Sequence, residues 1–198
     1  MGAGIARVGV LGGTFDPIHL GHLAIASEVC AELGLDQVLL VPANGQPFKE
    51  GMEAASPAHR LAMCRLVAED DERLAVSPVD IERGGTTYTV DTLMDLRAQR
   101  PDAELFFITG ADALARLDEW REPERLTELA TFVGVTRPGH SLVRLEWPHV
   151  LVEAPELAIS STDVRRRVRN GRPIRYLVPR RVAEYIAEHG LYDGGLDD

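Results

Sequence analysis

The sequence predicts a single α/β domain, a doubly wound Rossmann-like fold with a parallel sheet and helices on both faces. Short apolar runs alternate along the chain with longer amphipathic stretches. The runs are apolar throughout, which is typical of parallel strands buried on both sides. The 198 residues suit one core, without an internal repeat or linker. We predict a domain over residues 1–192 and a frayed tail over 193–198.

The apolar runs are predicted to be strands because each is short and is bounded by glycine, proline or polar residues. In chain order they are residues 7–11, 37–42, 74–79, 104–109, 131–136 and 149–153. Ligands bind such sheets at the carboxyl ends of the strands, near the point where the strand order reverses. The segments that follow the strands are therefore the candidate binding loops.

The intervening stretches have apolar residues at helical spacing, and most of them end at a glycine or a proline. The predicted helices are residues 20–33 before Gly34, 57–69, 89–100 before Pro101, 162–170 before Gly171 and 179–189 before Gly190, with further helical material between the strands at 104–109 and 131–136.

The composition argues against several classes of protein. A net charge of −10 does not suit a general nucleic-acid binder, which needs a basic surface. No apolar run approaches the ~20 residues of a membrane-spanning helix, and the first residues do not resemble a signal peptide. We expect a cytoplasmic protein without nucleic-acid or membrane partners. Cys30 and Cys64 lack a paired spacing and are expected to be buried, reduced thiols.

Arginine is nevertheless concentrated late in the chain. A local cationic site in an acidic protein suggests a small anionic ligand rather than a polymer. We expect all but one or two of these arginines to lie on solvated helix surface. They are Arg165, Arg166, Arg167, Arg169, Arg172, Arg175, Arg180 and Arg181.

A glycine turn and two histidines follow the first predicted strand, in the string GGTFDPIHLGH from Gly12 to His22. The string is neither GxGxxG nor a P-loop. His19 and His22 share one face of a helix whose N-terminus favours phosphate, so both imidazoles can donate to phosphate oxygens and would bind more strongly if protonated. Gly21 leaves room where a base or ribose could pack. A zinc site would need a third ligand, which is not evident, and a purely structural pair is the other alternative.

A second phosphate site is suggested by the string ISSTDVR, from Ile159 to Arg165. Its hydroxyl residues precede a predicted helix, and Ser160 with Asp163 loosely resembles a capping box. Capping alone would account for the serines. It would not account for Arg165, one turn into a helix at its phosphate-binding end.

The two strings resemble the signatures of the nucleotidylyltransferase superfamily, HxGH and ISSTxIR, with Val164 in place of isoleucine. The resemblance implies that the histidines steady the transition state and that the second string holds the β- and γ-phosphates of ATP. It makes His19, His22 and Arg165 the catalytic residues and assigns Asp16 to the substrate. The implied ATP ligands in these strings are Gly12, Gly13, Thr14, Phe15, His19, His22, Ile159, Ser160, Ser161, Thr162 and Arg165.

The loop after the second strand resembles the family's Pro-x-His-Lys element, with Phe48 in the histidine position. The resemblance implies that Lys49 reaches the ATP phosphates. A solvated surface lysine is the alternative.

The middle of the chain resembles bacterial nicotinate-mononucleotide adenylyltransferases through TTYTVDTL (86–93), TGADAL (109–114) followed by Trp120, and TRPG (136–139). The C-terminal segment from YLVP (176–179) through Tyr185 and Ile186 extends this resemblance over nearly the whole chain. It implies that Gly110, Asp112 and Arg137 bind ATP. It also implies that Thr87, Tyr88 and Trp120 bind the mononucleotide, Trp120 by stacking on the pyridine and Thr87–Tyr88 through backbone N–H groups on its carboxylate. Trp120 as ordinary packing and Asp112 as a helix cap remain alternatives.

The implied reaction is adenylyl transfer from ATP to nicotinate mononucleotide, giving deamido-NAD and pyrophosphate in NAD biosynthesis. Direct in-line attack needs no protein nucleophile, so positioning and charge stabilisation carry the catalysis. The sequence contains no evident carboxylate cluster for a metal, so Mg²⁺ is expected to arrive on the ATP phosphates. The alternatives are another acceptor, such as phosphopantetheine, or a non-catalytic nucleotide sensor. A homo-oligomer is compatible with the sequence.

Overall fold

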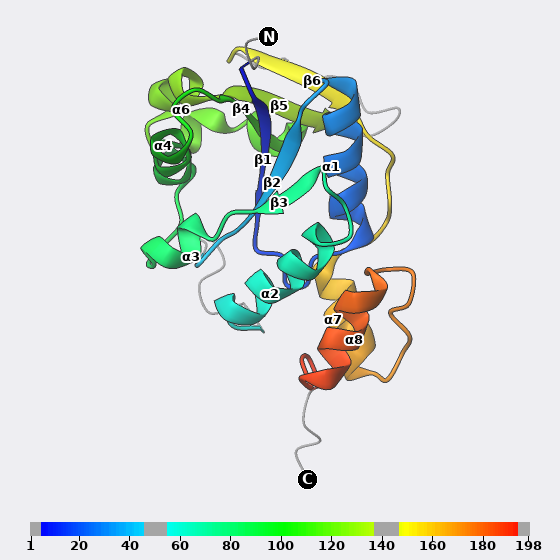
Figure 1. The fold of residues 1–198 in the computed structure, drawn as a ribbon. Helices are drawn as coiled ribbons and strands as arrows, with labels where there is room; N and C mark the ends of the chain where they lie inside the picture. Colours follow the sequence, from blue (N-terminus) through cyan, green and yellow to red (C-terminus); the bar gives the residue numbers. More distant parts are fainter. Residues whose placement is uncertain (1–4, 46–54, 137–146, 194–198) are drawn as a thin grey trace.

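The computed structural model describes residues 5–45, 55–136 and 147–193, and within them six parallel strands form one sheet (Figure 1). The strands are β1 (Arg7–Gly13), β2 (Gln37–Pro42), β3 (Leu74–Val76), β4 (Glu104–Gly110), β5 (Thr131–Thr136) and β6 (His149–Glu153). Every pairing between neighbouring strands is parallel. The predicted fold class is confirmed.

The predicted helices form at nearly the predicted positions, and α3 (Val79–Arg83) is an additional short helix that was not predicted. The others are α1 (Leu20–Glu32), α2 (Pro57–Ala68), α4 (Thr89–Gln99), α5 (Ala111–Leu114), the 3-10 turn η1 (Leu117–Glu119), α6 (Pro123–Leu129), α7 (Ser161–Arg169) and α8 (Arg180–Glu188). The strand predicted over 74–79 is too long. It stops at Val76, and Pro78 instead caps α3, because proline has no N–H to extend a ladder.

The order of the strands reverses beside β1. The sheet runs β3-β2-β1-β4-β5-β6, so β1 pairs with β2 on one side and with β4 on the other. Leu11 lies opposite Leu40 and Ile108. The loops that leave β1 and β4 therefore diverge at this reversal, which is where open parallel sheets bind ligands.

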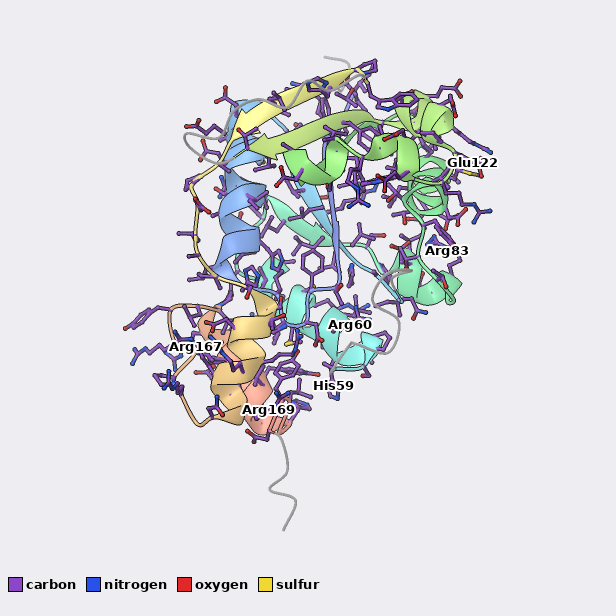
Figure 2. All side chains as sticks on the ribbon, turned by 180° about the vertical axis from the view of Figure 1, so that it is seen from behind. His59, Arg60, Arg83, Glu122, Arg167 and Arg169 are labelled. Atoms are coloured by element: carbon purple, nitrogen blue, oxygen red, sulfur yellow. The ribbon has the colours of Figure 1, made fainter. Side chains whose placement is uncertain are left out.

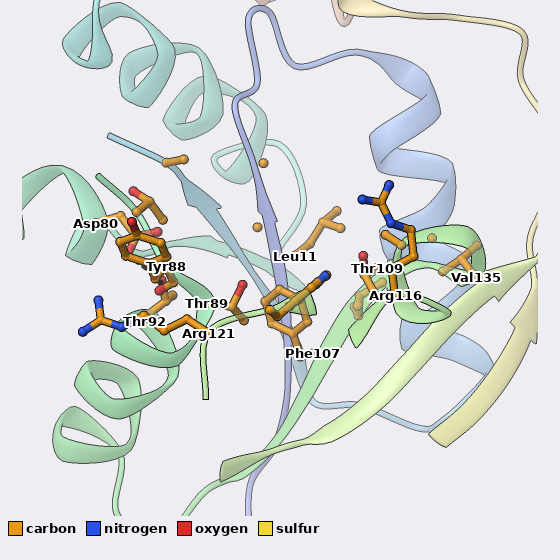
Figure 3. Close-up of a pocket in the computed structure, with 18 of the residues that line it drawn as sticks. Leu11, Asp80, Tyr88, Thr89, Thr92, Phe107, Thr109, Arg116, Arg121 and Val135 are labelled. Carbon is orange, nitrogen blue, oxygen red and sulfur yellow. Dashed lines mark hydrogen bonds between the residues drawn. The ribbon is translucent and has the colours of Figure 1, made fainter. Parts of the chain in front are cut away.

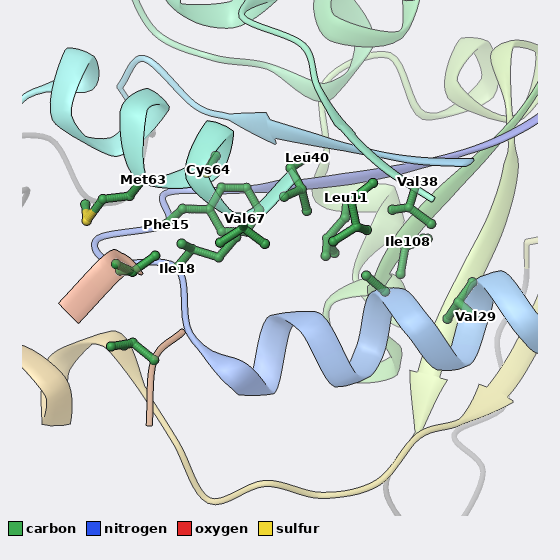
Figure 4. Close-up of a cluster of buried hydrophobic side chains, with 14 of the residues drawn as sticks. Leu11, Phe15, Ile18, Val29, Val38, Leu40, Met63, Cys64, Val67 and Ile108 are labelled. Atoms are coloured by element: carbon green, nitrogen blue, oxygen red, sulfur yellow. The ribbon is translucent and has the colours of Figure 1, made fainter. Parts of the chain in front are cut away.

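Two hydrophobic clusters cover the two faces of the sheet. One cluster packs α1 and α2 on the sheet through residues such as Val29, Leu40 and Val67 (Figure 4). The other includes Leu39 and Leu93 and packs α4 and α6 on the opposite face. Cys30 and Cys64 are buried free thiols, as predicted, and burial raises the pKa of both. None of the helices in the described ranges has the length and apolar character needed to cross a membrane.

The last two helices, α7 and α8, lie together beyond the carboxyl end of β1 (Figure 1). They join the first cluster through Val164, Val182 and Ile186, which are buried. The backbone N–H of Leu20, at the start of α1, donates to the carbonyl of Leu177, just before α8. This hydrogen bond joins the C-terminal segment to the end of the loop that contains the first phosphate motif. Of the predicted tail, residues 194–198 lie outside the described ranges.

Arg60 is a fully buried arginine on α2 (Figure 2). Its guanidinium donates to four backbone carbonyls, at 2.6 Å to Ala43, 2.7 Å to Thr14, 2.8 Å to Asn44 and 3.3 Å to Ala55. These carbonyls belong to the loops after β1 and β2 and to the start of α2. One side chain therefore holds together the two loops that border the carboxyl end of the sheet.

Arg60→Lys should lower the free energy of unfolding by about 2 kcal/mol, because an ammonium group cannot satisfy four carbonyls in this planar arrangement. Urea denaturation measures the change. Arg65→Lys, on the exposed face of the same helix, is the matched control and should stay within about 0.5 kcal/mol of wild type. Equal destabilisation by both substitutions would contradict this role of Arg60.

Candidate active site

A cavity of about 770 Å³ opens where the strand order reverses (Figure 3). Tyr88, Thr92 and Arg121 gather on one side of it, and Thr109 and Arg116 lie on the other (Figure 3). The full lining comprises Leu11, Gly12, Gly13, Ile25, Ala43, Asp80, Thr87, Tyr88, Thr89, Thr92, Phe107, Ile108, Thr109, Gly110, Ala113, Arg116, Glu119, Trp120, Arg121 and Val135. The volume suits a small-molecule ligand.

The glycine turn after β1 forms one edge of the cavity. Gly12 and Gly13 line it, so the backbone there is open to a ligand. The Thr14 hydroxyl is buried and lacks a hydrogen-bond partner among the described residues. Phe15 has a left-handed backbone, with φ of 52°, and its ring is buried in the core. The Phe15 side chain is therefore part of the core and is not accessible to a ligand.

The two histidines stack on each other at the start of α1, with 3.6 Å between ring centroids. The backbone N–H of His19 donates to Nδ1 of His22 over 3.2 Å. Because Nδ1 of His22 accepts this bond, its ring proton sits on Nε2. The packing also explains Gly21, since a Cβ there would lie 3.0 Å from the His19 ring. Gly21 thus makes room for His19, a role different from the predicted space for a base or ribose.

His19 is 7% exposed, and this burial lowers its pKa to about 4. Its imidazole is therefore neutral near pH 7, contrary to the expectation that protonation would strengthen its bond to phosphate. Nδ1 of His19 is buried and finds no partner in the described part of the chain. His19 is accordingly placed to act as a neutral hydrogen-bonding group.

The second phosphate motif lies directly against the first. Ser160 caps α7, accepting the Asp163 N–H over 3.1 Å, as predicted. The Asp163 carboxylate pairs with Arg166 and Arg167, so the predicted capping box is wrong. The Ser161 hydroxyl donates to the carbonyl of Pro17, over 2.8 Å. The N-terminus of α7 is thereby docked on the β1–α1 loop.

Arg165 makes the closest link between the two motifs. Its Nη1 donates to the backbone carbonyl of Asp16 over 2.7 Å, across 149 positions of sequence. Its Nη2 lies 3.4 Å from the Thr162 hydroxyl. Several of the other late arginines form surface ion pairs, as expected: Arg166 and Arg167 with Asp163, Arg180 with Glu184, and Arg181 with Glu69 and Asp70.

Trp120 follows η1, where it packs against two buried phenylalanines and also lines the cavity. Its ring lies edge-on to Phe107, with 6.0 Å between centroids, and 6.2 Å from Phe132. It also lines the cavity near Tyr88 and Arg121, whose guanidinium carbon lies 4.9 Å from the Tyr88 ring centroid. One side of Trp120 is packing, and the other is available to a ligand.

Thr87 lines the cavity, but its backbone N–H is already committed. It donates to the carbonyl of Gly45 over 2.7 Å, and the Thr87 hydroxyl accepts the N–H of Asn44 over 3.0 Å. The predicted use of the Thr87 N–H for a substrate carboxylate is therefore wrong. The first N–H groups of a helix lack intrahelical partners. Tyr88 caps α4 and Thr89 begins it, and both residues line the cavity, so the N-terminus of α4 lies at the cavity wall.

Asp80 is a buried carboxylate in the cavity wall that sequence reasoning missed. It accepts a 2.7 Å hydrogen bond from the Thr92 hydroxyl and forms an ion pair with Arg83. Burial nevertheless raises its pKa to about 6. Asp80 connects α3 to α4 and so braces the turn that carries Thr87 and Tyr88. In the sequence, Asp80 is a single acidic residue that belongs to none of the recognised motifs.

The remaining predicted residues are placed as follows. Gly110 lines the cavity and caps α5, so Asp112, exposed in the first turn, is not the cap. Asp16 is 2% exposed and lies in a buried polar cluster rather than in the cavity lining. Ile159 is half-buried and packs against the core. Lys49 and Arg137 lie outside the described residues.

Comparison with known proteins identifies the family of this chain. A family model described as cytidylyltransferase-like matches residues 10–167. A relative from Arthrobacter sp. (strain FB24), named probable nicotinate-nucleotide adenylyltransferase, is 54% identical over 189 residues, covering 94% of this chain and 92% of the relative. A relative of the same name from Streptomyces coelicolor is 55% identical over 188 residues, covering 93% and 100%.

A solved structure of Plasmodium falciparum nicotinic acid mononucleotide adenylyltransferase, complexed with NaAD, has the same fold. Its TM-score is 0.79 at 19% identity, covering 97% of this chain and 100% of that one. The chain belongs to the cytidylyltransferase-like family and, within it, to the nicotinate-nucleotide adenylyltransferases.

Proposed function

We propose that this enzyme transfers the adenylyl group of ATP to nicotinate mononucleotide, a step of NAD biosynthesis. A phosphate oxygen of the mononucleotide attacks the α-phosphorus of ATP in line. The bond from that phosphorus to the bridging oxygen breaks, which gives deamido-NAD and releases pyrophosphate. The observation that carries the proposal is the hydrogen bond from Arg165 to the Asp16 carbonyl, which docks α7 on the β1–α1 loop. This loop borders a cavity that is lined by the aromatic side chains of Tyr88, Phe107 and Trp120.

The phosphate groups of ATP would lie between the two motifs. Nε2–H of His22 can donate to a phosphate oxygen, and its orientation is set by the bond at Nδ1. Arg165 supplies a positive charge, and the N-terminus of α7 supplies N–H groups. These donors are in place before the reaction, so they stabilise the charge that develops on the leaving pyrophosphate without reorganisation.

Mg²⁺ would arrive bound to the ATP phosphates. Among the described residues, no group of three or more His, Cys, Asp or Glu side chains is arranged to hold a metal. When bound, the ion would neutralise phosphate charge. His22 and Arg165 would then orient the polyphosphate chain, and they would not need to neutralise all of its charge.

The pyridine end of the mononucleotide would lie between Tyr88 and Trp120. The free side of Trp120 offers an aromatic face to the cationic pyridine ring. The carboxylate would meet the N-terminus of α4 at Tyr88 and Thr89. These contacts distinguish the proposal from an acceptor such as phosphopantetheine, which has no aromatic carboxylate.

A pyrophosphate-release assay with ATP, Mg²⁺ and a panel of acceptors tests the function. Nicotinate mononucleotide should give the highest kcat/KM, because it alone combines a flat cation with a carboxylate. Phosphopantetheine is the acceptor that decides between the main alternatives within the family. Preferred turnover of phosphopantetheine, or ATP binding without pyrophosphate release from any acceptor, would reject the proposal.

Arg165→Lys should lower kcat/KM for ATP by about tenfold, because lysine keeps the charge but loses the planar fork. In the structure that fork faces the Asp16 carbonyl and the Thr162 hydroxyl at once. Arg166→Ala and Arg167→Ala are the controls, since both side chains pair with Asp163 on the helix surface. Equal losses at all three positions would point instead to a broader anionic partner.

A further inference from the structure

Tyr192 closes a buried polar cluster beneath the β1–α1 loop. It follows α8, is 8% exposed and has a left-handed backbone with φ of 65°. Its hydroxyl donates to Oδ1 of Asp16 over 2.7 Å, across 176 positions of sequence. The backbone N–H of Ala55 donates to the same oxygen over 3.2 Å. Two donors from distant segments therefore meet at one carboxylate oxygen.

The other carboxylate oxygen faces Arg165. Oδ2 of Asp16 lies 3.7 Å from Nη1 of Arg165, whereas a charge-assisted hydrogen bond between such groups is about 2.7–2.9 Å long. The same Nη1 instead donates to the backbone carbonyl of Asp16, over 2.7 Å. The carboxylate and the guanidinium are thus neighbours in a buried site without a tight ion pair between them.

We propose that Tyr192 is a positioning residue for ATP binding, because its hydroxyl holds the Asp16 carboxylate away from Arg165 and keeps that guanidinium available to phosphate. The inference rests on the proposed role of Arg165 at the ATP phosphates. Burial raises the pKa of the Tyr192 hydroxyl, so it stays protonated and serves as a donor. Without it, the carboxylate can turn toward Arg165 and compete with ATP for the guanidinium.

Tyr192→Phe removes the hydroxyl and keeps the ring in the core. The matched control is Tyr185→Phe on α8, whose hydroxyl lies 2.9 Å from Nδ1 of His59. Calorimetric titration with ATP and Mg²⁺, without acceptor, measures affinity, and thermal unfolding of each variant measures stability. We expect Tyr192→Phe to weaken ATP binding about tenfold. Tyr185→Phe should change it by less than about twofold at a similar loss of stability.

The two variants are then combined with Arg165→Lys. If Tyr192 acts through Arg165, Tyr192→Phe should weaken ATP binding by less than about twofold in the Arg165→Lys background, since the effects of coupled residues are not additive. A further tenfold loss of ATP affinity on adding Tyr192→Phe to Arg165→Lys would overturn the proposal. Equal effects of Tyr192→Phe and Tyr185→Phe on ATP affinity would also overturn it. A wild-type enzyme that binds ATP but releases no pyrophosphate with any acceptor would refute the proposed function alone, because the titrations need no turnover.

Discussion

His22→Ala should lower kcat by roughly 10²–10³, the usual cost of removing one preorganised donor to a developing oxyanion. The backbone N–H of His19 occupies Nδ1 of His22, so Nε2–H is the donor that the substitution removes. Steady-state kinetics with saturating ATP and nicotinate mononucleotide measure kcat. Urea unfolding of the same variant shows whether it remains folded.

Two matched substitutions separate the two ring nitrogens of His22. The amide nitrogen of glutamine can reach the position of Nε2, whereas that of asparagine lies closer to Nδ1. His22→Gln should therefore retain more activity than His22→Asn. His59→Ala is the remote control, because His59 contacts Tyr185 and His189 between α2 and α8. Near-normal kcat in a folded His22→Ala variant would remove this histidine from the mechanism.

The wild-type enzyme should use nicotinate mononucleotide with a kcat/KM at least ~100-fold higher than nicotinamide mononucleotide. The first N–H groups of α4, at Tyr88 and Thr89, can all be satisfied by carboxylate oxygens. An amide presents one oxygen and an NH₂ group, so a buried donor would face another donor and lose its partner. Comparable efficiency with the two mononucleotides would defeat this account of selectivity.

Trp120→Ala should raise KM for both pyridine mononucleotides and leave ATP affinity nearly unchanged. Because Trp120 also packs edge-on against Phe107, part of the loss could come from the core. Trp120→Phe is the control, since it keeps an aromatic face and much of that packing. Titration with ATP alone and steady-state kinetics with each mononucleotide separate the two sites. If Trp120→Ala mainly weakens ATP binding, Trp120 contacts ATP and the proposed contact with the pyridine ring is rejected.

Much of this architecture was predictable because its signals are local. A parallel strand buried on both sides is a continuous apolar run, and a helix end shows as a glycine or a proline. The predicted strand over 37–42 and the helix over 89–100 agree with β2 and α4 to within a residue. The resemblance to the superfamily rests on two motifs, and each can be recognised because its residues are continuous in the sequence.

The roles of individual polar groups depended on tertiary contacts. No local pattern could show that the Thr87 N–H donates to the carbonyl of Gly45, or that the Tyr192 hydroxyl donates to the carboxylate of Asp16. The sequence gives only a weak indication that Arg60 is buried, because it lies on the same helix face as Cys64 and Val67. Its four carbonyl partners come from loops that folding brings together. A buried polar group must find a partner wherever the chain brings one, and here the partners lie as far as 176 positions away. The residue types and their order therefore determine which chemistry is available, while the packing of distant segments decides which donors and acceptors remain for the substrates.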